Sequence, residues 1–165
     1  LVAAQIEQKV TPDQACTLVS RLLYERTSPE KYATGFLGIL DAGSGALCYT
    51  SAGHNPGLVV RSDGSTEWLQ PSGMPLGLMP VGGYKTADVT LGAGDTVVLY
   101  TDGITEANNP EEEECGEQRL EAVCIANRHL PPRELAAALD RELETFAQGV
   151  PYADDRTVVI LQKLD

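Results

Sequence analysis

Three aspartates stand where strand-like runs of the chain end or begin. Asp102 follows the strand-like run 98–101 and is followed by a glycine, whereas Asp154 and Asp155 come immediately before the apolar run 156–163. These aspartates could simply be turn residues, because aspartate and glycine are common in turns. Alternatively, carboxylates from two strand ends at the rim of one core could share a hard divalent cation such as Mg²⁺ or Mn²⁺. The residues alone leave both interpretations open.

The elements that must position these carboxylates can be read from two periodicities. Apolar residues recur at helical spacing behind Thr11-Pro12-Asp13, and again in the segment after Pro131-Pro132. Between them, short runs with a period of two are separated by glycine-rich turns. The predicted helices cover 12–24, 117–128 and 132–147, and the predicted strands cover 35–41, 46–52, 57–62, 65–70, 84–90, 96–101 and 156–163.

The order of these elements predicts an α+β layered fold, because helices stand at both ends of a strand-rich middle. The first four strands are expected to form an antiparallel meander, and 71–83 is expected to cross between sheet edges as an irregular loop. The continuous apolar centre of 156–163 predicts a strand in a sheet that is covered on both faces. Residues 1–10 have helical propensity but no cap, so we expect that the chain starts within a helix.

Length and composition restrict the classes of protein and partner that fit this chain. A chain of 165 residues with 42% hydrophobic and 22% charged residues predicts one globular domain over 1–165. A net charge of −12 without basic clusters argues against a nucleic-acid partner; it either serves solubility or attracts cations or a basic partner. No apolar run is long enough to span a bilayer, so this segment is expected to make no membrane contact. The cysteines lack a C-x-x-C spacing, which favours reduced thiols in a cytoplasmic protein.

Four motifs in one order carry a family resemblance. The chain resembles the SpoIIE-type branch of the metal-dependent PPM protein serine/threonine phosphatases over nearly its whole length. The motifs, in chain order, are YTSAGHNPGLVV, SGMPLGL, YTDGITEA and ADDRTVVILQK. The resemblance implies an α-β-β-α sandwich of two antiparallel sheets flanked by helices.

The resemblance also assigns roles to residues. It implies that Asp102 and Asp154 are metal ligands, with Asp155 as a further candidate. His54, in the SAGHNP turn, is either a structural turn residue or a catalytic group that protonates the leaving oxygen. Gly73 to Leu78 matches a supporting loop. The implied cofactors are two Mn²⁺ or Mg²⁺ ions, which activate water for in-line attack on a phosphate monoester.

The chain departs from the family pattern at its start. Family members carry a Gly-Asp-x-x-Asp-like strand and an Asp-Val-Ser-Gly-type turn, which supply further metal ligands, and neither occurs here. We therefore expect a fold that is incomplete at its N-terminus and a first metal shell of which about half is absent.

Two functions remain after this comparison. The resemblance implies a phosphoserine or phosphothreonine phosphatase that acts on a phosphorylated anti-sigma-factor antagonist, a STAS-domain protein of bacterial partner switching. An N-terminal sensor or receiver domain would regulate it. The alternative is a metal-free pseudophosphatase that serves as a protein-binding module; the missing motifs favour it, whereas Asp102 and Asp154 oppose it.

Overall fold

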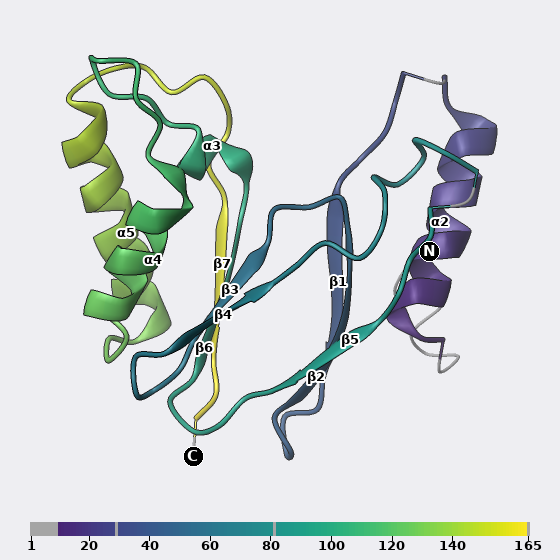
Figure 1. The fold of residues 1–165 in the computed structure, drawn as a ribbon, viewed down its shortest axis with the longest axis horizontal. Coiled ribbons are helices and arrows are strands. Elements are labelled where there is room, and N and C mark those ends of the chain that lie inside the picture. Colours follow the sequence, from purple (N-terminus) through teal and green to yellow (C-terminus); the bar gives the residue numbers. More distant parts are fainter. Residues whose placement is uncertain (1–9, 29, 81, 165) are drawn as a thin grey trace. The chain divides into compact units, whose positions relative to one another are not determined.

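The computed structural model describes residues 10–28, 30–80 and 82–164, so the helical start predicted over 1–10 lies almost entirely outside the described residues. The chain divides into two compact units, one drawn from 1–56 and 70–91 and the other from 57–69 and 92–165. Each unit consists of an antiparallel sheet with helical cover (Figure 1). This confirms the α+β class with two antiparallel sheets and helices.

The first unit carries one long described helix against a sheet in the order β1-β2-β5. The helix begins at Pro12, which has no backbone N–H that would need a partner in the first turn. The Thr11 amide donates to Oε1 of Gln14 at 3.2 Å. Its Cys16 packs with Ala52 of the sheet in a small buried cluster. The element bounds are α2 Pro12–Arg26, β1 Gly35–Leu40, β2 Ala46–Ala52 and β5 Ala87–Thr90.

The second unit carries the strand ends of interest. Its sheet has the order β4-β3-β6-β7, and all three pairings are antiparallel. The strands are β3 Gly57–Val60, β4 Thr66–Leu69, β6 Thr96–Tyr100 and β7 Val158–Gln162, and the helices are α3 Asp102–Thr105, α4 Gly116–Ala126 and α5 Pro132–Ala147.

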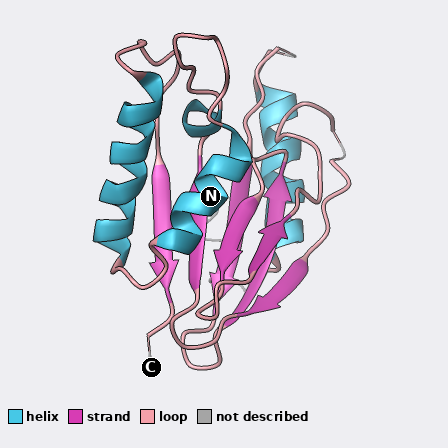
Figure 2. Ribbon diagram, turned by 60° about the vertical axis from the view of Figure 1, so that its left-hand side comes forward, coloured by secondary structure: helices cyan, strands magenta, loops and turns pink. Residues whose placement is uncertain are grey.

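The core of the second unit lies between this sheet and α4 and α5. In Figure 2, α5 runs alongside the strand that leads to the C-terminal end. Helix α5 begins after Pro131 and buries one stripe of apolar residues spaced four apart. The buried cluster joins Leu58, Val60, Val98 and Tyr100 of the strands to Ile104, Leu120, Leu135, Leu139, Leu143 and Phe146 of the helices.

The predicted meander is wrong, because its strands belong to two sheets. Strands β1 and β2 pair with each other, and so do β3 and β4, but β2 and β3 lie in different sheets. Strand β2 takes β5 as its second neighbour, and β3 takes β6. Turn signals predict hairpins locally, whereas these distant pairings decide which sheet each hairpin joins. The irregular segment 71–83 does lead from one sheet to the other, as expected.

The prediction of a sheet covered on both faces holds for its central strands, since all four residues of β3 are buried, but it fails for the last strand. Strand β7 stands at the end of its sheet, and Val159 and Leu161 are 47% and 42% exposed. Val158 and Ile160 pack against the helical core. Within β7, residues that pack on the helices therefore alternate with residues that stay exposed, because this strand lies at the sheet edge. Among the described helices, none is long and apolar enough to cross a membrane.

Candidate metal centre

Asp102 stands where β6 gives way to α3. The strand ends at Tyr100, Thr101 caps the following turn, and Asp102 is the first residue of a single helical turn that ends at Thr105. Asp102 thus lies in one turn of helix. The Asp102 side chain is exposed, and its Oδ1 accepts a hydrogen bond from the Gly103 amide at 3.0 Å. No ion pair to Asp102 occurs among the described residues.

Asp154 and Asp155 lie in the turn that leads from α5 to β7. Both side chains are exposed, and Asp154 Oδ1 accepts from the Asp155 amide at 2.7 Å. The two residues line a surface depression of about 550 Å³ together with Tyr152, Ala153 and Arg156. Neither carboxylate forms an ion pair within the described part of the chain, so both can still take a cation.

The two aspartate-bearing turns touch at Gly103. A Cβ atom built on Gly103 would stand 2.5 Å from the carbonyl oxygen of Asp155 and 3.2 Å from that of Asp154. The Thr101 hydroxyl donates to the same Asp155 carbonyl at 3.0 Å and accepts from the Thr157 amide at 2.9 Å. The structure therefore brings the segments of Asp102, Asp154 and Asp155 together at one end of the sheet.

Arg156 links the Asp154–Asp155 turn to helix α5. Its guanidinium carbon lies 3.7 Å from the centre of the Tyr152 ring, and its Nη1 lies 3.1 Å from Oδ1 of Asp140 on α5. This arginine is therefore directed to α5 and to Tyr152. Sequence reasoning missed Thr101 and Arg156 as contributors, although both stand inside the motifs that it singled out.

The donor set fits a hard divalent cation but fills only part of its coordination shell. Carboxylate oxygens without a cationic partner are the ligands that Mg²⁺ and Mn²⁺ take. Within the described residues, however, no group of three or more histidine, cysteine, aspartate or glutamate side chains is arranged to hold a metal ion. Asp102 and Asp154 could thus serve as part of a site that needs further oxygen ligands or water.

His54 belongs to the first unit and has a structural environment there. Its Nδ1 lies 3.3 Å from the Thr34 hydroxyl, and its carbonyl accepts from the Ser51 hydroxyl at 3.4 Å. Gly53, at φ +63°, packs against Pro75: an added Cβ would meet the Pro75 ring at 2.6 Å. The segment 73–78 thus supports the turn, as its motif implied. A catalytic role for His54 stays a prediction.

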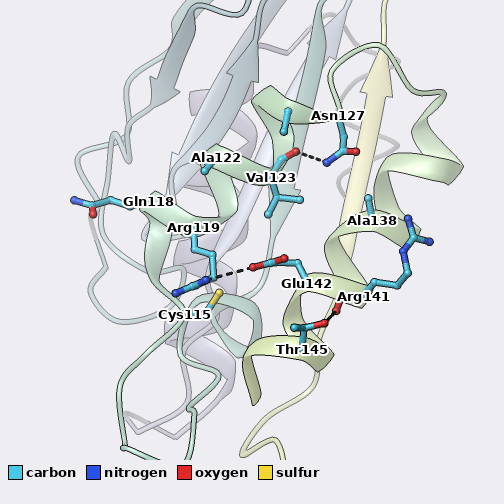
Figure 3. Close-up of a pocket in the computed structure, with 11 residues that line it drawn as sticks. Cys115, Gln118, Arg119, Ala122, Val123, Asn127, Ala138, Arg141, Glu142 and Thr145 are labelled. Atoms are coloured by element: carbon cyan, nitrogen blue, oxygen red, sulfur yellow. Dashed lines mark hydrogen bonds and ion pairs between the residues drawn. The ribbon is translucent and has the colours of Figure 1, made fainter. Parts of the chain in front are cut away.

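A second depression lies on the helical side of the second unit, between α4 and α5 (Figure 3). It has a volume of about 820 Å³, and it contains none of the predicted site residues. Arg119 and Glu142 face each other in it at 3.3 Å, and Arg119 also stacks over Phe146 at 4.4 Å. These groups already pair with one another, so the depression offers no comparable set of open ligands.

Comparison with known proteins decides the family. The family model described as Stage II sporulation protein E (SpoIIE) matches residues 1–163. The chain belongs to the SpoIIE family. A curated relative, the phosphoserine phosphatase RsbU of Bacillus subtilis (strain 168), is 30% identical over 101 residues, which is 61% of this chain and 30% of RsbU. The chain spans between 19% and 30% of the length of three curated relatives.

Solved structures agree with this assignment. The RsbU and RsbW domains of Rv1364c from Mycobacterium tuberculosis match with a TM-score of 0.76 and 27% identity, over 99% of this chain and 45% of that one. The phosphatase domain of the cell fate determinant SpoIIE from Bacillus subtilis, presoaked with Mn, matches with a TM-score of 0.71 and 22% identity, over 99% of this chain and 71% of that one. The second likeness shows that this chain shares the fold of that phosphatase domain.

Proposed function

We propose that this SpoIIE-family chain is part of a metal-dependent protein serine/threonine phosphatase. The observation that supports the proposal is the contact between the main chains of the Asp102–Gly103 turn and the Asp154–Asp155 turn at one end of the sheet. The relationship to a phosphoserine phosphatase, RsbU, supports the reaction class. Mn²⁺ or Mg²⁺ is the proposed cofactor, because a carboxylate-rich site suits hard cations.

In this proposal the chain's residues bind and orient. Asp102 and Asp154 present carboxylate oxygens to the cation, with Asp155 beside them as a further ligand candidate. A divalent cation supplies positive charge that neutralises phosphoryl oxygens and makes water more acidic. His54 is proposed to give a proton to the leaving serine or threonine oxygen. No cysteine nucleophile is needed, and burial raises the pKa values of Cys16, Cys115 and Cys124, which keeps these thiols protonated.

The proposed substrate is a phosphorylated anti-sigma-factor antagonist of the STAS type. Similarity to RsbU, and to a protein that joins RsbU and RsbW domains, supports a place in partner switching. Such substrates act in the bacterial cytoplasm, so a cytoplasmic location belongs to the same proposal. Because the curated relatives are several times longer than this chain, we also propose that a sensor or receiver domain regulates the full-length protein.

A metal-free pseudophosphatase that binds a partner protein is the second candidate. It is favoured by one observation, namely that the described residues hold no cluster of three potential metal ligands. Such a module would have no use for uncompensated carboxylates on two touching turns. Metal dependence therefore separates the two functions.

The test is hydrolysis of a phosphoserine STAS protein by the full-length protein. Turnover should require Mn²⁺ or Mg²⁺ and should stop on chelation. Asp102→Asn keeps the shape of the side chain but removes its charge, so it should lower kcat/KM by about 100-fold or more, since even groups that only support ligands cost 10–100-fold. Asp63→Asn is the matched control, because Asp63 is an exposed aspartate of the β3–β4 turn that accepts hydrogen bonds from the nearby Ser65. Turnover that survives chelation, or an active Asp102→Asn variant, would refute the proposal.

A further inference from the structure

Thr101 occupies the step at which β6 leaves its partner strand. The β6–β7 pairing runs from Thr96 opposite Gln162 to Tyr100 opposite Val158, so one further step places Thr101 opposite Thr157. In antiparallel sheets, residues of a hydrogen-bonded pair exchange two main-chain bonds, each amide donating to the opposite carbonyl. The Thr101 amide makes the first of these bonds, to the Thr157 carbonyl at 3.0 Å.

The second main-chain bond is replaced by a side-chain bond. The Thr101 carbonyl instead accepts from the Ile104 amide at 3.1 Å, which closes the helical turn containing Asp102. The Thr157 amide, which would have used that carbonyl, donates to the Thr101 hydroxyl at 2.9 Å. The hydroxyl thus takes the place of the carbonyl, and β6 can turn into α3 without releasing the start of β7.

The same hydroxyl also fixes the residue next to Asp154. It donates to the Asp155 carbonyl at 3.0 Å, so its donor and one of its acceptor sites are both used on the segment 155–157. Gly103 then lets the main chain of Asp154 and Asp155 approach without a side chain in between. Three hydrogen bonds between Thr101 and the segment 155–157, two donated and one accepted by Thr101, therefore hold one aspartate-bearing turn against the other.

We propose that Thr101 is a positioning residue, whose hydroxyl holds the Asp154–Asp155 turn beside Asp102 so that the carboxylates of both turns can bind one cation. This inference rests on the proposed metal-dependent function. It goes beyond the metal ligands, because it makes cation binding depend on the Thr101 hydroxyl, which itself binds no metal.

The experiment compares three variants of the full-length protein. Thr101→Val keeps the branched shape but removes the hydroxyl, Thr101→Ser keeps the hydroxyl, and Thr145→Val removes a hydroxyl that donates only to the Arg141 carbonyl within α5. Mn²⁺ affinity is measured by titration calorimetry, and the amide exchange of Thr157 is measured without metal. Thermal unfolding confirms that each variant is folded.

Thr101→Val should bind Mn²⁺ about 10- to 100-fold more weakly, which is the usual effect of losing a group that orients ligands. Its Thr157 amide should exchange faster, because the acceptor is gone. Thr101→Ser and Thr145→Val should stay within about threefold of wild type. The inference is overturned if Thr101→Val binds Mn²⁺ like wild type, or if Thr101→Ser loses as much affinity. A wild-type protein that binds no Mn²⁺ would instead refute the proposed function.

Discussion

Gly103 lies directly against the carbonyl group of Asp155. The position that a Cβ atom on Gly103 would take is 2.5 Å from the Asp155 oxygen, closer than real Cβ atoms come to their neighbours. The neighbour is main chain, which cannot rotate aside as a flexible side chain would. The missing side chain at 103 is therefore what lets the two aspartate-bearing turns meet.

Gly103→Ala should push these turns apart. Overpacking of this kind usually costs about 1–3 kcal/mol, so the free energy of unfolding in urea should fall by that amount. Mn²⁺ affinity of the full-length protein should fall with it. Gly92→Ala is the matched control, because the nearest atom to its added Cβ lies at 3.6 Å, an ordinary contact. Equal losses in both variants would show that the close approach at Gly103 is not decisive.

Arg156→Ala should loosen the Asp154–Asp155 turn, because it removes both the stacking on Tyr152 and the ion pair with Asp140. The loss of stability should be about 0.5–2 kcal/mol, with faster amide exchange at 153–157. Arg156→Lys keeps the charge without the planar group and should fall in between. Arg133→Ala, at an exposed position at the start of α5, should change neither quantity. Unchanged exchange in Arg156→Ala would contradict the tethering role.

The buried cysteines should be inert in the native protein. Burial raises the pKa of Cys124 to about 12 and that of Cys16 to about 11, in each case with a further increase from a nearby carboxylate. For Cys124 the rise is about three pKa units, which makes the thiolate fraction about 1,000-fold smaller. Alkylation of the buried thiols by iodoacetamide at pH 8 should therefore occur only after the protein unfolds. The partly exposed Cys48 should react first. Mass spectrometry of timed samples can follow each thiol; native labelling of Cys124 at the denatured rate would contradict this expectation.

Local spacing was enough to predict several elements. Pro131-Pro132 and the apolar stripe of Leu135, Leu139 and Leu143 predicted α5 with the bounds that the structure gives. The position of Asp102 at a strand end was likewise predictable, because apolar β-forming residues precede it and glycine follows. In both cases the signal lies within a few residues of the element it predicts.

What depends on distant partners could not be read from the sequence. The division of the first four strands between two sheets follows from the pairings of β2 with β5 and of β3 with β6. The contacts of Thr101 with Asp155 span 54 positions, and those of Arg156 reach α5 across a turn. Threonine and arginine have many ordinary roles, so nothing in their residue type marked them before the turns were placed together.

Asp95 holds the end of the β3–β4 hairpin beside the start of β6. Its side chain is 7% exposed and accepts three hydrogen bonds at 2.9 Å, from the Arg61 guanidinium and from the amides of Ser62 and Gly92. Burial by itself would raise the pKa of Asp95, but these hydrogen bonds and the Arg61 charge together outweigh it. The pKa of Asp95 therefore lies below its usual value of 3.8.

A carboxylate stabilises the fold when its pKa is lower in the folded state than in the unfolded state. The full stabilisation is present above the unfolded pKa, which is about 3.9 for aspartate. It is lost as the pH falls through the folded pKa. Asp95→Asn should therefore lower the free energy of unfolding at pH 7 by about 1–3 kcal/mol, and its difference from wild type should shrink as the pH falls below about 4. Glu67→Gln is the control, because it removes the other carboxylate on Arg61, 49% exposed, and should cost less than about 1 kcal/mol. Urea unfolding at a series of pH values measures both variants. If the Asp95→Asn difference stayed constant down to pH 2, the ionised Asp95 carboxylate would not be the group that stabilises this hairpin.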